Sequence, residues 1–199
     1  MLAVDAILIA RKHRNYVLRR FNKWYVYIPS ILVILFVLNV FMANRGVITG
    51  FDNHRNVSMN MAPNLLPGDL IATDTRQYVF DHVPDRGEII TFKFPRDESI
   101  IYVKRVLGLP SENISIKDGI LYINGETIAE SYVQEGSNVR PYSQNMEEIT
   151  VPENHVFVLG DNRDNSNDSR FWGMLPISNV NGKVTLIWYA NDTSRIKKI

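Results

Sequence analysis

Two alternating runs, GEIITFKF (87–94) and IIYVKRVL (100–107), decide the fold class of this chain. Their apolar residues recur with a period of two, and Ile, Val, Tyr and Phe all favour extended backbone. The same composition returns in three more segments: ISIKDGILYING (114–125), HVFVLGD (155–161) and GKVTLIWYA (182–190). Turn residues separate the runs at short intervals, as between neighbouring antiparallel strands. The sequence therefore predicts a mainly β domain built of antiparallel, folded sheets.

Outside these runs, residues 126–150 carry Gly136, Pro141 and many polar side chains, so we expect an extended or looped insertion there. The bulk composition excludes several classes of site. A formal net charge of +1 over 199 residues predicts no nucleic-acid partner, and the lack of Cys excludes disulfides and thiol catalysis. Four scattered His residues offer little material for zinc, so we predict no metal and no cofactor.

An apolar segment lies near the N-terminus: WYVYIPSILVILFVLNVFMA (24–43) contains no ionisable group other than tyrosines. Its length is about what a helix needs to cross roughly 30 Å of hydrocarbon. Trp24, Tyr25 and Tyr27 gather at one end, where an aromatic belt would lie. Pro29 is tolerable this close to the start of a helix. We predict a transmembrane helix over 24–43, with a buried core helix as the alternative.

Basic residues flank this segment unevenly. RKHRNYVLRRFNK (11–23) holds six Lys or Arg before it, whereas only Arg45 follows it before the chain turns polar and mixed. The positive-inside rule places residues 1–23 in the cytoplasm and residues 44–199 outside. A cleaved signal peptide would have a shorter apolar core, so we predict a retained anchor. MLAVDAILIA (1–10) is too short to span, and is either an interfacial segment or the stub of an earlier helix.

Lys104 lies inside one of the predicted strands, in YVKRVLGLP (102–110). With a period of two, it shares one strand face with Tyr102 and Val106. If that face is buried, desolvation lowers the pKa of the amine, and a neutral lysine can act as a general base near neutral pH. The pattern alone leaves a second interpretation open, in which Lys104 points from the sheet into solvent.

A dense polar segment, GDNRDNSNDSRFWG (160–173), follows the apolar run HVFVL. Its short side chains suit a hydrogen-bonded cradle, whereas its aspartates and arginines could simply pair with one another in a surface turn. A calcium loop is a third interpretation, although such loops have more acidic oxygens at regular spacing and fewer arginines. The segment taken alone leaves these alternatives open.

Three motifs in this order resemble the type I signal peptidases (leader peptidases), membrane-bound serine peptidases with a Ser/Lys dyad: NMAPNLLPGD (60–69), YVKRVLGLP (102–110) and GDNRDNSNDSRFWG (160–173). The last one matches the family pattern Gly-Asp-Asn-Arg-x-x-Ser-x-Asp-Ser-Arg-x-x-Gly at every fixed position. With the anchor, the resemblance covers nearly the whole chain, and VDAILIARKHR resembles the end of the first membrane helix in two-helix members. It implies the signal-peptidase fold and cleavage of signal peptides after small residues.

The resemblance implies a role for each matching polar residue. Lys104 matches the family's general base, and Ser166 matches the serine that hydrogen-bonds this base. Four further residues match the polar network that supports the site: Asp161, Arg163, Asp168 and Arg170.

The nucleophile motif departs from the family pattern. That pattern, Ser-Met-x-Pro-Thr-Leu-x-x-Gly-Asp, aligns with residues 60–69 and implies two substrate-binding residues, Met61 and Pro63. Asn60 stands at its serine position, and Asn64 replaces its threonine. Ser58, two residues earlier, matches a serine that helps line the oxyanion hole in some members. A carboxamide has no hydroxyl proton to give to a lysine, so Asn60 cannot begin acyl transfer as serine does.

Three explanations of Asn60 are open at this point. Ser58 with Met59 could be the true nucleophile pair after a two-residue insertion, although two strand residues move a hydroxyl by about 6–7 Å. The chain could be an inactive relative that still binds exported peptides. Lastly, Asn60 could be an introduced replacement in an otherwise active enzyme.

The resemblance therefore implies a bacterial, single-pass membrane endopeptidase of the signal peptidase I type. It would act at the extracytoplasmic side of the inner (cytoplasmic) membrane. Its partners would be the signal peptides of exported preproteins and membrane lipid, and the extended substrate would add as a strand beside the sheet edge. The alternative is a catalytically inactive homologue that binds exported peptides or regulates their processing.

Overall fold

The chain forms two compact units in the computed structural model, Met1–Asn44 and Arg45–Ile199. The structure describes residues 24–44, 48–78 and 82–199. The predicted basic segment 1–23, with its possible stub of an earlier helix, lies outside the described residues.

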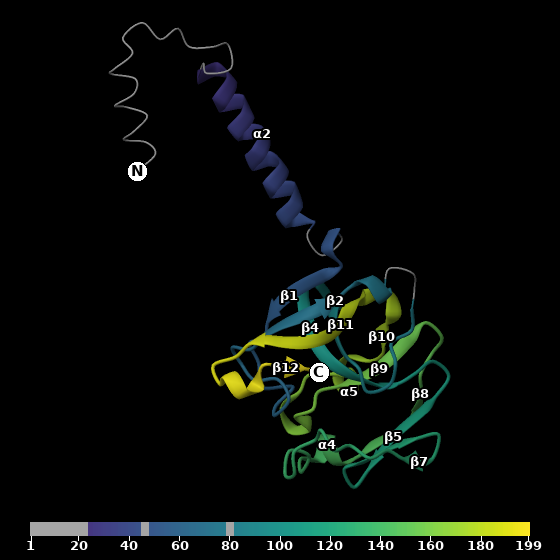
Figure 1. Cartoon of the computed structure of the whole chain (residues 1–199). Coiled ribbons are helices and arrows are strands. Elements are labelled where there is room, and N and C mark those ends of the chain that lie inside the picture. The colour runs from purple at the N-terminus through teal and green to yellow at the C-terminus, as the bar shows by residue number, and fades with distance from the viewer. Residues whose placement is uncertain (1–23, 45–47, 79–81) are drawn as a thin grey trace, which may run out of the picture. The chain divides into compact units, whose positions relative to one another are not determined.

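The described part of the first unit is one helix, α2 (Trp24–Ala43), at the position that the sequence predicts for a membrane span (Figure 1). Its stretch Tyr25–Ala43 is long and apolar enough, by length and composition, to cross a membrane. Pro29 lies inside the helix, and the neighbouring Ser30 hydroxyl donates a hydrogen bond to the Val26 carbonyl at 2.7 Å. This polar side chain is therefore satisfied within the helix itself.

The second unit contains two antiparallel sheets, the larger with eight strands. Its strand order is β1-β2-β11-β3-β4-β9-β10, and β12 pairs with β11. The strands are β1 (Phe51–Arg55), β2 (Leu70–Asp74), β3 (Ile89–Phe94), β4 (Asp97–Gly108), β9 (His155–Leu159), β10 (Leu175–Pro176), β11 (Val180–Tyr189) and β12 (Lys197–Lys198). In the register of β3 and β4, Ile90 lies opposite Lys104.

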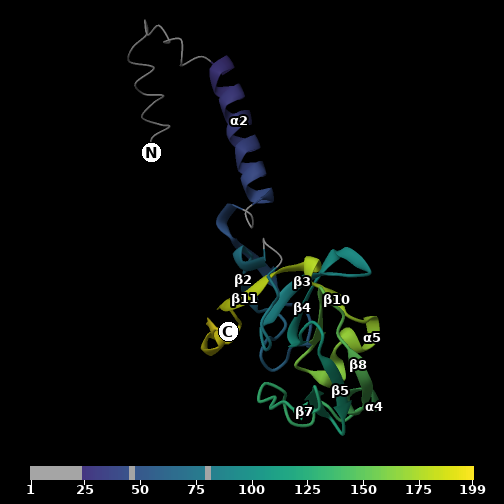
Figure 2. The same cartoon turned by 90° about the vertical axis from the view of Figure 1, so that its right-hand side faces the viewer.

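The smaller sheet has four strands in the order β7-β6-β5-β8. They are β5 (Asn113–Lys117), β6 (Ile120–Ile123), β7 (Glu126–Thr127) and β8 (Met146–Thr150). The predicted KDG turn joins β5 to β6, and Asp118 and Gly119 adopt φ angles of 52° and 76° in it. Both views place this sheet at the end of the unit away from β2 (Figures 1 and 2).

The helices whose bounds the structure gives in residues 48–78 and 82–199 are all short. They are η2 (Arg76–Tyr78), α4 (Pro141–Gln144), η3 (Arg163–Asn165), α5 (Ser169–Trp172), η4 (Ile177–Asn179) and η5 (Thr193–Arg195). Two of them, η3 and α5, lie in the polar segment 160–173. Its backbone thus turns tightly twice, and its side chains can point back towards the sheet.

Three apolar clusters hold β4 and its neighbours in place. One joins Met61 and Leu65, which precede β2, to Ile71, Ile89 and Ile187. A second lies on β3, β4 and β9, and a third joins β4 and β9 to the smaller sheet. Because β4 contributes to all three clusters, its side chains are among the most firmly positioned in the unit.

The predicted fold class is confirmed: the unit is mainly β, with antiparallel sheets and an apolar N-terminal helix. All five alternating runs form strands, and 126–150 is an insertion that contains only β7, α4 and β8. The strand β1 was not predicted, because FDNHR has no alternation of apolar and polar residues. Pairing with β2, rather than its own composition, holds it extended.

Candidate active site

The loop between β1 and β2, residues 56–69, carries the predicted nucleophile position. Two hydrogen bonds close its neck, from Asn56 N to Asp69 O and from Gly68 N to Asn56 O, both 2.8 Å long. Inside the loop, Met61 and Leu65 are completely buried in the core. The loop is thus fixed at its neck and its middle, which holds the turn between them in a defined position.

A second loop, residues 160–173, is joined directly to the first. The Asn162 backbone N–H donates to the Asn60 carbonyl at 3.0 Å, and the Asn162 carboxamide donates to the Met59 carbonyl at 3.1 Å. Gly160 lies at the closest approach, where a Cβ atom would be 2.2 Å from Ser166 Oγ and 2.5 Å from the Asn60 carbonyl oxygen. Only glycine fits there, and it brings Ser166 and Asn60 together.

Three buried ion pairs support these loops. Arg170 makes a bidentate pair with Asp168, with distances of 2.8 and 2.9 Å, and Asp168 also accepts from the Gly160 N–H. Asp161 pairs in the same way with Arg105 of β4, at 2.8 and 2.7 Å. A third pair joins Arg163 to Glu130. The loop's aspartates thus bind arginines and backbone amides, as a polar cradle would and as a calcium loop would not.

Lys104 points into the interior and is 0% exposed, which rules out the interpretation that it faces solvent. Its Nζ donates to the Val103 carbonyl at 3.1 Å and lies 5.2 Å from the centre of the Tyr102 ring. Burial lowers the pKa of Lys104 to about 8, against the opposing effect of the Asp168 and Asp161 charges. A substantial fraction of this amine is therefore neutral at mildly alkaline pH, as a general base requires.

Unsatisfied polar atoms gather near the same place. The Asn60 Oδ1 and Ser166 Oγ atoms are buried and have no hydrogen-bond partner among the described residues. The Ser58 hydroxyl instead accepts a hydrogen bond from the Asn60 backbone N–H at 3.2 Å. Within the described chain, the Lys104 amine makes its hydrogen bond to a carbonyl and none to Ser58, Asn60 or Ser166.

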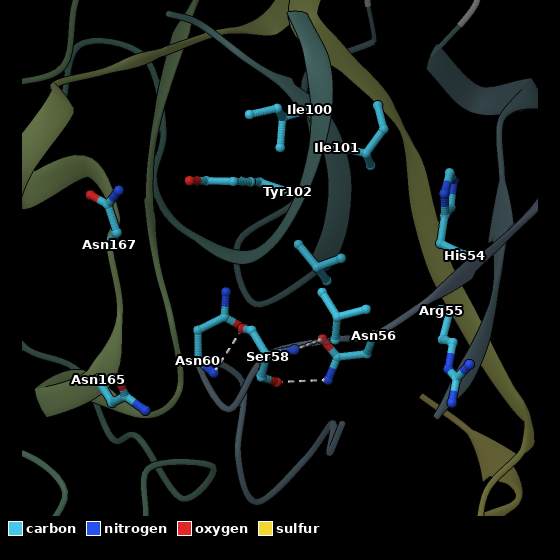
Figure 3. A pocket seen from close by; sticks show the side chains of 12 residues that line it. His54, Arg55, Asn56, Ser58, Asn60, Ile100, Ile101, Tyr102, Asn165 and Asn167 are labelled. Atoms are coloured by element: carbon cyan, nitrogen blue, oxygen red, sulfur yellow. Dashed lines mark hydrogen bonds between the residues drawn. The ribbon is translucent and has the colours of Figure 1, made fainter. Parts of the chain in front are cut away.

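A groove of about 430 Å³ opens over this turn. Ile100, Ile101 and Tyr102 of β4 lie across it from Ser58 and Asn60 (Figure 3). The remaining walls are formed by His54, Arg55, Asn56, Val57, Val103, Asn165 and Asn167. Two strand edges border the groove: β1 is the end strand of its sheet, and β4 pairs with β9 only over Arg105–Gly108.

Comparison with known proteins identifies the family. The model of the family described as "Signal peptidase, peptidase S26" matches residues 23–189, which is most of the chain. The chain belongs to the signal peptidase family. The resemblance to type I signal peptidases that the three motifs indicate is thereby confirmed.

Two sequence relatives agree with this assignment. The chain is 35% identical over 158 residues to a probable signal peptidase I-1 of Synechocystis, covering 76% of this chain and 74% of the relative. It is 33% identical to the signal peptidase I of Pseudomonas aeruginosa, covering 66% and 62%. A crystal structure of a signal peptidase I from Enterococcus faecalis is 37% identical, with a TM-score of 0.45, over 51% of this chain and 97% of that one.

The structure brings some of the predicted site residues together but leaves two of them outside the groove. It brings Ser58, Asn60 and Ser166 together, and the charges of Asp161, Asp168 and Arg170 act on Lys104. Met61 is fully buried in the core and Pro63 is exposed, and neither lines the groove. Their role in substrate binding, implied by the signal-peptidase motif, stays a prediction.

Three further residues shape the site without having been predicted. Arg105 is the partner of Asp161, and Glu130, in the insertion, is the partner of Arg163. Asp164 binds a later part of the insertion, since its carboxylate accepts hydrogen bonds from the Val139 and Arg140 N–H groups at 3.0 Å. The sequence could have pointed to Arg105, because it is adjacent to Lys104. Glu130 and Asp164 could not be found in this way, because their contacts join residues more than 20 positions apart in the sequence.

Replacing Lys104 with methionine is expected to change how stability depends on pH. The folded pKa of about 8 lies below the ordinary value of 10.5, so the unfolded chain binds this proton more tightly. The unfolding free energy of the unmodified protein should therefore rise between about pH 8 and pH 10.5, by up to about 3 kcal/mol. Methionine removes this rise and stabilises the protein at pH 7, where the buried amine is charged.

Thermal unfolding of the full chain in detergent micelles, from pH 7 to pH 10, measures the effect as a difference between variants. Lys117→Met, at an exposed position of β5, is the matched control and should follow the unmodified protein. If stability depends on pH in the same way in Lys104→Met and in the unmodified chain, the lowered pKa of Lys104 is contradicted.

Proposed function

We propose that this chain binds the signal-peptide region of exported preproteins in the groove, and that with Asn60 in place it binds without efficient cleavage. The observation that carries the proposal is the position of Asn60 in the wall of this groove. A family-type base, Lys104, is buried with a pKa of about 8, but the residue aligned with the nucleophile offers a carboxamide. The site therefore has the means to recognise a peptide but lacks the hydroxyl that attacks it.

The free strand edges support an extended ligand. Residues 101–103 of β4 pair with β3 on one side, and residues 100–103 line the groove. A peptide lying there would form main-chain hydrogen bonds with this edge, as in other cases of strand addition. Ile100 and Ile101 provide apolar contacts along it, and Asn165 and Asn167 offer carboxamides from the second loop.

The contact between Ser58 and Asn60 supports an oxyanion role for Ser58. Its hydroxyl oxygen accepts a hydrogen bond from the Asn60 backbone N–H at 3.2 Å, which holds the hydroxyl beside residue 60 and leaves its own proton to donate to a carbonyl oxygen of a bound peptide. We therefore assign Ser58 to binding the carbonyl oxygen.

The helix α2 supports a membrane location. An apolar span with six Lys or Arg in residues 11–23 before it would hold the β unit on the extracytoplasmic face of the inner membrane. Signal peptides would reach the groove as they leave the bilayer. Both sequence relatives compared above are bacterial, which fits this placement.

Binding of a fluorescent peptide that spans a signal-peptide cleavage region tests the proposal. Anisotropy with the full chain in micelles should show saturable binding, and mass spectrometry should show the peptide intact. Ile101→Arg, which introduces a charge into the groove wall, should weaken binding by about tenfold or more.

The matched control is Ile120→Arg, because Ile120 is a similarly exposed isoleucine on the smaller sheet, outside the groove. Its affinity should equal that of the unmodified chain. Absence of saturable binding, or equal losses in both variants, would refute recognition in this groove.

A further inference from the structure

The segment after β11 makes an unexpected contact with the nucleophile-bearing loop. Residues 190–199 lie beyond the part of the chain that matches the family model, 23–189. They form η5 and β12, and β12 returns along β11 opposite Leu186 and Ile187. This return brings Arg195, at the end of η5, against the loop of residues 56–69.

All hydrogen bonds that Arg195 makes through its terminal nitrogens go to this one loop. Nη1 donates to the Pro63 carbonyl at 3.1 Å, and Nη2 donates to the Asn64 carbonyl at 3.1 Å. Nη2 also pairs with the Asp69 carboxylate at 2.8 Å. One planar guanidinium thus joins the middle of the loop to its end, across about 130 residues of sequence.

Both partners are themselves held in place. Asp69 is 3% exposed, and its carboxylate also accepts from the Leu66 N–H at 2.8 Å. On the other side, the Asp192 side chain caps η5 by accepting from the Ser194 N–H at 3.0 Å. The cationic group therefore sits on a capped turn and reaches a buried carboxylate, a stronger arrangement than an ordinary surface pair.

We infer that Arg195 is a positioning residue, which clamps the loop of residues 56–69 and so fixes Ser58 and Asn60 in the groove. Asn64 makes the opposite contact, because its carboxamide donates to Asp161 at 2.8 Å in the second loop. The loop is held between the C-terminal segment and the polar cradle. The consequence for a bound peptide rests on the function proposed above, whereas the clamp itself does not.

Hydrogen exchange on the full chain in micelles tests the clamp without using activity. Four of the hydrogen-bonded loop amides serve as reporters: Ala62, Leu65, Leu66 and Asp69. In Arg195→Ala these amides should exchange about ten- to a hundredfold faster, as expected when charge-assisted hydrogen bonds are lost, while amides of β3 and β4 stay unchanged. Arg195→Lys, whose ammonium cannot reach all three acceptors, should give a smaller increase.

Arg76→Ala is the matched control, since Arg76 makes a bidentate pair with Asp74 at the end of β2, and its side chain makes no hydrogen bond to the loop of residues 56–69 in the described chain. Unchanged exchange at the four amides in Arg195→Ala, or equal increases in both alanine variants, would overturn the clamp. A second measurement uses Asn60→Ser as background, where Arg195→Ala should lower kcat more than it raises KM. If that background shows no cleavage, the proposed chemistry fails, and the exchange result still decides the clamp.

Discussion

Replacing Asn60 with serine is expected to give this chain preprotein cleavage at least about a thousandfold faster than the unmodified protein shows. The new hydroxyl would stand in the groove wall beside Ser58, at the position that the motif resemblance aligns with the family's nucleophile. Lys104, buried and easily deprotonated, would take its proton, while the Ser58 hydroxyl would donate a hydrogen bond to the oxyanion. Gel or mass-spectrometric analysis of a preprotein in detergent micelles measures the gain.

The pH profile of Asn60→Ser identifies the base. Only neutral Lys104 can accept a proton, so the rate should rise about tenfold per pH unit below its pKa of about 8 and level off above it. Adding Lys104→Met should abolish the gain. Cleavage by the unmodified chain that Ser58→Ala removes would instead make Ser58 the nucleophile and contradict the binding role assigned to it.

Replacing Asp168 with alanine is expected to destabilise the β unit more than other single changes near the site. Asp168 is 0% exposed, and its loss leaves the almost fully buried guanidinium of Arg170 without its carboxylate. Breaking such a pair costs about 3–5 kcal/mol, which should lower the melting temperature by about 10 °C or more. The Gly160 N–H would lose its acceptor as well.

Glu98→Ala provides the comparison for this prediction. Glu98 also faces a cation, Lys93, but at 4.0 Å and on the surface, so its removal should hardly change the melting temperature. Thermal unfolding of both variants in micelles, followed by circular dichroism, gives the difference. Equal melting temperatures would mean that the buried pair contributes no more than a surface pair.

The elements that the sequence predicted are those whose own residues determine them. The alternating runs at 87–94 and 100–107 specify β3 and β4, because branched and aromatic side chains on one face must be buried. By contrast, β1 consists of polar residues and depends on its neighbour β2. Strands of this kind are set by tertiary pairing, which no local pattern records.

For the site, too, the sequence predicted some features and left others to the folded structure. Alternation placed Lys104 on a face with Val106 but could not show whether that face was buried; the structure does. The partners Arg105 and Asp161 lie 56 residues apart, and Arg163 and Glu130 lie 33 apart. Such pairs arise only when the sheets fold over one another, so the family motif could indicate their importance but not their contacts.

The hydrogen bond from Asn162 to the Met59 carbonyl joins two loops that lie 103 residues apart in the sequence, so the two loops are synthesised at different times. The ribosome adds residues at about 5–20 per second, so the first loop emerges roughly 5–20 seconds before the segment that holds it. During that interval residues 56–69 have neither the Asn162 bridge nor the Arg195 clamp. A newly made chain therefore cannot hold the groove in its finished form until Arg195 has been synthesised.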